Sequence, residues 1–271
     1  MRENDKLKKI QETELEILTE FDRICRKHGL TYFLDSGTAL GAVRHGGFIP
    51  WDDDIDVGMP REDYEKFMSI APTEMDPAFF LQNKVTDPKS PYYFAKIRKN
   101  NTLFMEWNKR NMDIHHGIYI DIFPYDNLPD DQTEREAFLS KCKKLYQLYV
   151  YRTIPDRDAP PQKGLKWMVM ASVRRMLHYL VMPIPLSYLE KKSNELYQSH
   201  NQQETRYTSC CIYGFTFMKD HLYPVKEIQF EDKVFFGPAD TDAYLTSLYG
   251  DYMTLPKEED RMNHFPYKVE V

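Results

Sequence analysis

A run of aspartates that leads directly into an apolar alternation is the feature that most constrains this chain. Trp51-Asp52-Asp53-Asp54-Ile55-Asp56 continues as Val57-Gly58-Met59, and Pro60 ends the pattern. Alternation of polar and apolar residues with a period of two is typical of a β-strand. We therefore predict a strand over residues 54–59, on which Asp54 and Asp56 share one face and Asp53 points away, while the direction of Asp52 stays open.

Two later segments alternate in the same way. Residues 93–98 and 118–123 are strand-like, and turn residues follow each of them. The second segment contains Ile120-Asp121-Ile122, in which an aspartate stands between apolar neighbours. Burying an unpaired carboxylate costs on the order of several kcal/mol, so a bound cation is a good physical reason for Asp121.

Helical periodicity is prominent in the rest of the chain. An opening helix is expected between Leu7 and Gly29, where glycine provides a stop. Further helical patterns lie around 39–43, 132–150, 163–182, 187–199 and 240–248, and strand-like residues lie at 32–34, 229–230 and 234–236. This combination predicts an α+β fold with a boundary near residue 130, so that residues 1–130 hold most of the sheet and residues 131–271 are mainly helical.

The charge and cysteine content exclude several classes of protein. A net charge of −6 disfavours binding to a polyanion, so no nucleic acid is expected as a partner. The four cysteines show neither disulfide-dense nor zinc-type spacing, and the first residues are charged, which favours a cytoplasmic protein. The longest apolar stretch, at 167–185, contains Arg174, Arg175 and His178, which are costly at a bilayer centre, so no membrane span is expected.

Asp54, Asp56 and Asp121 form a candidate metal site. Two carboxylates separated by one residue on a strand lie about 7 Å apart, which suits oxygen ligands around Mg²⁺. Metal ions held in this way neutralise phosphate oxygens during phosphoryl transfer. A solvated acidic turn is the alternative, whereas an EF-hand is disfavoured because the glycine at the sixth loop position and the distal glutamate are missing from the sequence.

Several longer motifs resemble the LicD family. The match is carried by Phe33-Leu34-Asp35-Ser36-Gly37-Thr38-Ala39-Leu40-Gly41-Ala42-Val43-Arg44-His45, followed by Gly47-Phe48-Ile49-Pro50-Trp51 and the aspartate run. It continues in residues 95–98 and 117–124, and from Tyr249 through Pro256 to Arg261 and His264. The resemblance implies a nucleotidyltransferase-like fold, in which helices flank a mixed sheet and the C-terminal part is helical.

The resemblance also implies roles for individual residues. Gly37-Thr38 matches a turn near the phosphates, although the gap between it and Asp54 is longer than in simpler nucleotidyltransferases. Asp54, Asp56 and Asp121 match the metal ligands, with Mg²⁺ as the expected ion and Mn²⁺ as an alternative. Residues 1–130 are then the catalytic core, and residues 131–271 complete the active site.

Members of the LicD family include bacterial phosphorylcholine transferases that use CDP-choline to decorate surface glycans, and relatives of fukutin that use CDP-ribitol. The implied reaction moves a phospho-alcohol, phosphocholine first, from a CDP-linked donor to a hydroxyl of a glycan or its lipid-linked precursor, and releases CMP. Asp121 is the candidate base for the hydroxyl proton, in competition with Asp52 and Asp53. The alternatives are nucleotidyl transfer from an NTP to a small acceptor, and a nucleotide- or glycan-binding module without turnover.

Basic residues near these motifs are candidates for binding the donor. Arg44 and His45 precede a glycine pair and the acidic run, where a cation pairs either with donor phosphate or with the aspartates. Lys96 and Arg98 share one strand face and are expected to reach a common phosphate, with a solvated basic face as the alternative.

Two features of the second half complete the expectations. Arg261 and His264 lie three residues apart, and we expect them to close over the nucleotide or to cap a packing surface. Residues 163–182 combine basic and apolar residues at helical spacing, which predicts either ordinary helix packing or an interfacial helix close to a lipid-linked acceptor. The expected location is therefore the cytoplasm, including the inner face of the membrane.

Overall fold

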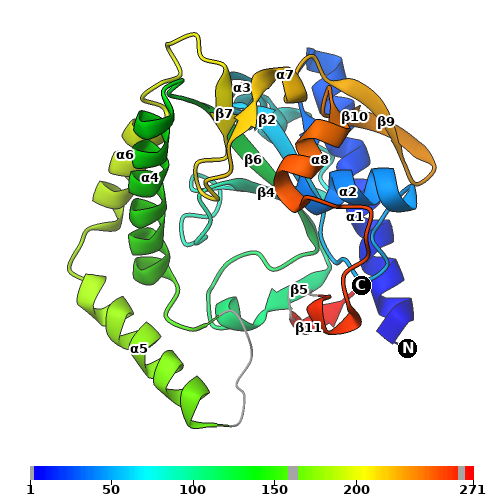
Figure 1. Cartoon of the computed structure of the whole chain (residues 1–271). Coiled ribbons are helices and arrows are strands. Elements are labelled where there is room, and N and C mark those ends of the chain that lie inside the picture. The colour runs from blue at the N-terminus through cyan, green and yellow to red at the C-terminus, as the bar shows by residue number, and fades with distance from the viewer. Residues whose placement is uncertain (1–2, 158–163, 262–265) are drawn as a thin grey trace.

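The computed structural model describes residues 3–157, 164–261 and 266–271. A mixed β-sheet with helices around it lies at its centre (Figure 1), so the predicted α+β class is confirmed. The main path of the sheet has the strand order β1-β2-β6-β4-β3, and β7 and β8 continue from β6. The strands are β1 (Phe33–Leu34), β2 (Asp56–Pro60), β3 (Phe79–Gln82), β4 (Ala95–Lys99), β6 (Tyr119–Leu128), β7 (Tyr207–Ser209) and β8 (Phe217–Met218).

The central pair of the sheet, β2 and β6, runs parallel. The other pairings in this sheet are antiparallel. Val57 of β2 and both Ile120 and Ile122 of β6 are fully buried, which places the hydrophobic core against this pair.

β6 is longer than the sequence pattern predicts, because it continues through Pro124. The Asp121 N–H donates to Ile55 O at 2.8 Å, and backbone N–H groups alternate in direction along a strand, so the nitrogen of Pro124 faces away from β2. On that side, pairing with β4 ends at Ile122 and pairing with β7 begins at Asp126. The proline therefore falls in the gap between two partner strands and removes no ladder hydrogen bond.

The first helix, α1 (Glu3–His28), contacts β4 and β6. Its apolar residues recur every three or four positions, and Ile17, Phe21 and Ile24 are fully buried. The backbone leaves the helix at Gly29, whose φ of +63° is a conformation that glycine adopts without steric cost. The predicted opening helix and its stop are confirmed.

Three further helices lie near the β1–β2 end of the sheet. α2 (Ser36–His45) follows β1 and contacts β2, and α3 (Arg61–Glu74) follows β2 and contacts β6. α8 (Thr241–Tyr249) packs against α2, and Asp240 caps it by accepting a hydrogen bond from the Ala243 N–H at 3.0 Å. The C-terminal part of the chain therefore returns to the segment that links β1 to β2.

The second half contains three long helices. α4 (Gln132–Thr153), α5 (Leu165–Val181) and α6 (Leu186–Tyr197) confirm the helices predicted there. α4 contacts both α5 and α6, and α5 lies at the outer edge of the molecule in Figure 1. After α6 the chain rejoins the main sheet as β7, so the division near residue 130 stays a prediction.

Smaller elements complete the fold. β9 (Lys226–Phe230) and β10 (Lys233–Gly237) form a hairpin at the strand-like residues of the tail, and β5 (Leu103–Glu106) pairs with β11 (Pro266–Glu270). Short helical turns are η1 (Trp107–Lys109), α7 (Lys219–Leu222) and η2 (Glu258–Asp260). Within the described ranges, no helix combines the length and the apolar character needed to cross a membrane.

Candidate active site

Asp56 and Asp121 are register partners on the parallel strands β2 and β6. Adjacent strands lie about 5 Å apart and partner residues point to the same face, so the two carboxylates lie side by side. Asp121 is only 6% exposed. Burial, followed by the negative charges of Asp54 and Asp121, raises the pKa of Asp56 well above its usual value. Two aspartates that the sequence singled out separately therefore share one site.

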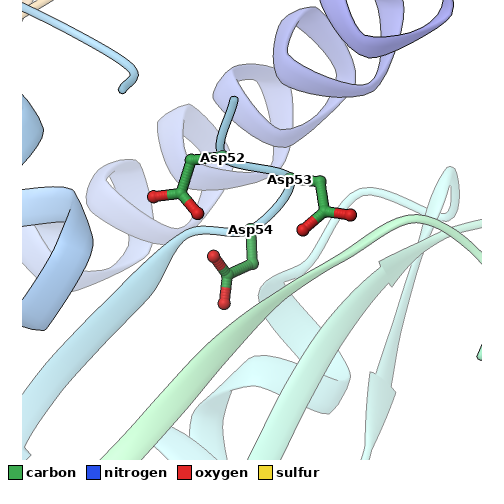
Figure 2. A group of neighbouring side chains, drawn as sticks. All are labelled: Asp52, Asp53 and Asp54. Atoms are coloured by element: carbon green, nitrogen blue, oxygen red, sulfur yellow. The ribbon is translucent and has the colours of Figure 1, made fainter. Parts of the chain in front are cut away.

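The loop before β2 brings together three more carboxylates. Figure 2 shows Asp52, Asp53 and Asp54 on this loop, and one oxygen from each lies within 4.8 Å of the others. β2 begins at Asp56 instead of residue 54, so the loop lacks the alternation of a strand. The expectation that Asp53 points away is therefore wrong, because the strand period does not apply there.

The Gly37-Thr38 turn adjoins this acidic loop. The Asp56 N–H donates to Thr38 Oγ1 at 2.8 Å, and Thr38 is buried, so its hydroxyl fixes the start of β2 against α2. A Cβ atom on Gly37 would come within 3.1 Å of Asp52 Oδ2, which places the first turn of α2 next to that carboxylate. Backbone N–H groups at a helix start favour anions, so this turn can receive a phosphate beside the aspartates.

Lys96 lies beside Asp121 on the neighbouring strand. The two residues are register partners, and Lys96 Nζ donates a hydrogen bond to Asp121 Oδ1. The Lys96 ammonium also lies 3.5 Å from the ring centroid of Tyr119 and 4.3 Å from that of Tyr92. Burial lowers the pKa of Lys96 to about 8, against the opposing effect of Asp121. The structure thus places this predicted ligand-binding lysine in contact with a predicted metal ligand.

Arg98 requires a correction. Its side chain shares a strand face with Lys96 as predicted, but its Nε donates to Gln82 Oε1 at 2.5 Å and its Nη1 donates to Gly117 O at 2.7 Å. Arg98 is 1% exposed. Its guanidinium therefore cross-links β3, β4 and the start of β6 instead of reaching a phosphate, because burial commits it to internal acceptors.

The basic residues at the end of α2 contact the C-terminal segment. Arg44 Nη1 donates to Tyr252 O at 2.8 Å, and Arg44 Nε donates to His45 Nε2 at 3.0 Å. His45 is exposed and meets Trp51 edge to face, with 6.3 Å between ring centroids. Both residues lie close to the acidic loop, since Trp51 directly precedes Asp52.

Arg261 reaches the same loop from the far end of the chain. Its guanidinium carbon lies 4.3 Å from the ring centroid of Trp51. The second half of the molecule therefore supplies a cation beside the aspartate run, while closure of Arg261 over a nucleotide stays a prediction. His264 lies outside the described residues.

Two acidic residues near the site were missed at the level of sequence. Asp35 is 2% exposed and accepts hydrogen bonds from the hydroxyls of Tyr125, at 2.8 Å, and Tyr244. Burial raises the pKa of Asp35, and its place between β1 and the Ser36-Gly37 turn was a usable signal. It ties the start of α2 to β6 and α8.

Glu14 is the other missed residue. It stands four positions after Ile10 and four before Leu18, on the apolar face of α1, and it is 1% exposed. Among the described residues, no hydrogen-bond partner reaches either of its carboxyl oxygens. Burial, followed by the charges of Asp54 and Asp53, raises the pKa of Glu14 well above its usual value. An acidic residue at a core position of a helix was the signal that could have found it.

A large cavity lies elsewhere in the described structure. Its volume is about 790 Å³, and Pro60, Arg61, Tyr125 and Asn127 belong to its wall, at the carboxyl ends of β2 and β6. The aspartates lie at or before the opposite ends of the same strands. We assign the candidate site to the aspartates, because several like charges in a partly buried region favour a bound cation, whereas cavity size carries no chemistry of its own.

Part of the chain matches a known protein family. Residues 29–159 match the family model described as LicD/FKTN/FKRP, nucleotidyltransferase domain, and this range contains Gly37, the aspartate run and Asp121. Residues 29–159 are therefore similar to a LicD-type nucleotidyltransferase domain. All the proposed metal ligands lie within this matched range, whereas Glu14 precedes it and Arg261 follows it.

Similarity to individual proteins extends beyond residues 29–159. The lipopolysaccharide cholinephosphotransferase LicD of Haemophilus influenzae is 27% identical over 261 residues, which cover 92% of each chain. An uncharacterized protein of Rickettsia typhi is 42% identical over 142 residues, covering 50% of this chain and 40% of that protein. Mouse ribitol 5-phosphate transferase FKRP is 32% identical over 82 residues, covering 29% of this chain and 16% of that protein.

Proposed function

We propose that this chain is a Mg²⁺-dependent phosphotransferase that moves phosphocholine from CDP-choline to a hydroxyl of a cell-surface glycan or its lipid-linked precursor. The observation that carries the proposal is the pairing of Asp56 with Asp121 across β2 and β6, beside Asp54 and the first turn of α2. The similarity to a lipopolysaccharide cholinephosphotransferase along 92% of the chain supports this choice of reaction.

The side chains fit a divalent cation. Asp54, Asp56 and Asp121 offer the oxygen ligands that Mg²⁺ and Mn²⁺ prefer, and the buried carboxyl of Glu14 is an uncompensated acid beside them. When bound, the metal would neutralise charge on the diphosphate oxygens of the donor. We therefore assign metal binding to Asp54, Asp56 and Asp121.

The other residues of the site act on the donor and the acceptor. The first turn of α2 at Gly37 and Thr38 receives the diphosphate through its backbone amides, while Arg44, His45 and Arg261 line the approach to the aspartates. The electrostatic role of Lys96 is to hold Asp121 in its ionised form, because an adjacent ammonium favours the carboxylate.

In the proposed reaction, an acceptor hydroxyl oxygen attacks the alcohol-side phosphorus in line with the bridging oxygen. The new phosphorus–oxygen bond forms, the bond to the bridging oxygen breaks, and CMP leaves with that electron pair. The hydroxyl proton passes to a carboxylate, for which Asp121 is our candidate, with Asp52 and Asp53 as competitors. The product is a phosphodiester between the alcohol and the glycan.

Choline is the alcohol that we favour over ribitol. Tyr213 packs edge to face on Phe123, with 5.3 Å between ring centroids, and its ring is exposed. Desolvation, followed by the charge of Asp56, raises the pKa of Tyr213, so its hydroxyl lies within electrostatic reach of the aspartates. An exposed aromatic face near carboxylates suits a quaternary ammonium group.

A donor panel tests the proposed function. CDP-choline, CDP-ethanolamine, CDP-glycerol and CDP-ribitol are incubated with Mg²⁺ and a glycan acceptor, and CMP release is measured for the wild type and for Asp54→Ala/Asp56→Ala. We expect CMP release from CDP-choline with the wild type and none with the double variant. The control Asp113→Asn, whose exposed carboxylate pairs with Lys89, should release CMP like the wild type. Pyrophosphate release from an NTP would support nucleotidyl transfer instead. Metal-dependent release from none of the donors would refute the proposal.

A further inference from the structure

α5 carries an apolar stripe that faces solvent. No residue of this helix is buried. Most of its exposed apolar side chains, between 44% and 76% exposed, form one set: Leu165, Met168, Val169, Val173, Met176, Tyr179 and Leu180; Met170, 43% exposed, lies outside this set. With a rotation of about 100° per residue, these side chains fall within a continuous sector about 140° wide. A helix normally buries a stripe of this width, yet among the residues that the structure describes nothing covers it.

The opposite side of α5 fixes this orientation. Arg174 Nη2 donates to Val150 O at 2.9 Å and to Ile154 O at 2.5 Å, and His178 Nδ1 lies 2.8 Å from Tyr151 O. These contacts attach α5 to the end of α4, and Figure 1 shows α5 at the periphery, beyond α4. Because these hydrogen bonds attach the polar side of α5 to the end of α4, the apolar stripe on the opposite side faces solvent.

The charges of α5 differ in sign from those of the whole chain. Leu165–Val181 contains Lys166, Arg174 and Arg175 and no acidic residue, in a protein whose net charge is −6. Helical rotation places Lys166 at one border of the stripe and Arg175 at the other. Arg175 shares the carboxylate of Asp156 with Arg110, so this group of three keeps a net positive charge.

We propose that α5 docks the protein on an anionic phospholipid surface. The apolar stripe would enter the boundary between headgroups and acyl chains, while Lys166 and Arg175 would reach the lipid phosphates from its two borders. A second copy of this chain is the less suitable partner, because a two-fold contact through the stripe would bring the same basic borders together.

The docking helix connects with the candidate site through ion pairs and ring contacts. Asp156 joins Arg175 of α5 to Arg110, which follows η1. Lys109 of η1 lies 4.6 Å from the ring centroid of Tyr92, the ring that Lys96 also contacts next to Asp121. These contacts link α5 to the part of the sheet in which Lys96 contacts Asp121.

Vesicle flotation of the full chain tests the proposal. Vesicles of phosphatidylcholine alone and of phosphatidylcholine with phosphatidylglycerol are compared, for the wild type and for Met168→Ser/Val169→Ser/Met176→Ser. We expect the wild type to bind the anionic vesicles preferentially, and the triple variant to bind at least about tenfold more weakly. The matched control is Val85→Ser/Val234→Ser/Leu255→Ser, which removes three exposed apolar side chains outside α5 and should bind like the wild type.

A charge variant separates the two contributions. Lys166→Gln/Arg175→Gln should lose most of the preference for phosphatidylglycerol while its helical content, measured by circular dichroism, stays that of the wild type. If the triple variant loses helical content, Met176→Ser replaces it in the comparison. Absence of binding to both vesicle types, equal binding by the stripe variants, or a dimer that dissociates in those variants would each overturn membrane docking.

Discussion

Lys96 and Asp121 form a buried ion pair across β4 and β6, and each is the register partner of the other. Asp121 is also the register partner of Asp56 on its other side. One carboxylate therefore stands between a fixed ammonium and a second carboxylate. This arrangement links the stability of the sheet to the chemistry of the site, because both depend on the charge of Asp121.

Replacing Lys96 by methionine should destabilise the protein strongly. Lys96→Met leaves the Asp121 carboxylate buried without its cation, which costs about 3–5 kcal/mol of unfolding free energy. Urea denaturation in the presence of EDTA measures the loss. The control is Lys99→Met, which removes a partly exposed ion pair with Glu16 and should cost at most about 1 kcal/mol. Similar losses of unfolding free energy for the two variants would show that the buried ion pair contributes no more to stability than the exposed one.

Glu14→Gln should change how stability depends on pH. Because burial and the neighbouring aspartates raise the pKa of Glu14 in the folded state, its ionisation opposes folding as the pH rises above the unfolded value of about 4.3. Well below pH 4, the carboxyl is protonated in both states and this penalty is absent. We expect Glu14→Gln to be more stable than the wild type at pH 8, by about 1–3 kcal/mol, with the advantage shrinking toward pH 4.

Thermal unfolding without metal, recorded from pH 4 to pH 8, checks this expectation. Glu16→Gln on the same helix is the matched control, since its exposed side chain lies outside the core. A Glu14 variant with the pH profile of the wild type would mean that this carboxyl does not ionise in the folded protein or finds a cation there.

Thr38→Val should loosen the start of β2. The substitution keeps the shape of the side chain but removes the acceptor of the Asp56 N–H, and a buried amide without a partner costs about 1–3 kcal/mol. Thr38→Ser retains the hydroxyl and should stay within about 1 kcal/mol of the wild type. Denaturation curves of both variants, together with CMP release, will show whether the hydrogen bond holds Asp56 in place for the reaction.

Mg²⁺ should stabilise the wild type and leave the double aspartate variant unaffected. A ligand that binds the folded state at about 100 times its Kd adds about 2.7 kcal/mol of stability. Asp54→Asn/Asp56→Asn removes two proposed ligands, whereas Asp113→Asn leaves them in place. Differential scanning calorimetry with and without MgCl₂ measures the shift in Tm. An equal shift in the double variant would place the binding of Mg²⁺ elsewhere.

The sequence predicted much of the local structure. The period of the apolar residues predicted the opening helix and the three long helices of the second half. It also predicted strands at 93–98 and 118–123, which the structure has as β4 (Ala95–Lys99) and β6 (Tyr119–Leu128). Asp121 was identified because an aspartate between two isoleucines needs a partner inside a core. The spacing of apolar residues indicates which residues of a helix or strand share a face, provided that the helix or strand is regular.

Only the tertiary structure decided which side chains contact one another. Asp53 lies beside Asp52 and Asp54 because these residues form a loop, in which side chains do not alternate between two faces. Arg98 donates hydrogen bonds to Gln82 and Gly117, which lie 16 and 19 positions away in the sequence. Glu14 reached the aspartates by the packing of α1 on the sheet, and Arg261 reached Trp51 from the opposite end of the chain. The sequence by itself determined most of the helices and strands and which carboxylates are candidate ligands. The tertiary structure alone decided which charged side chains contact one another, because such contacts depend on long-range packing that no local sequence pattern encodes.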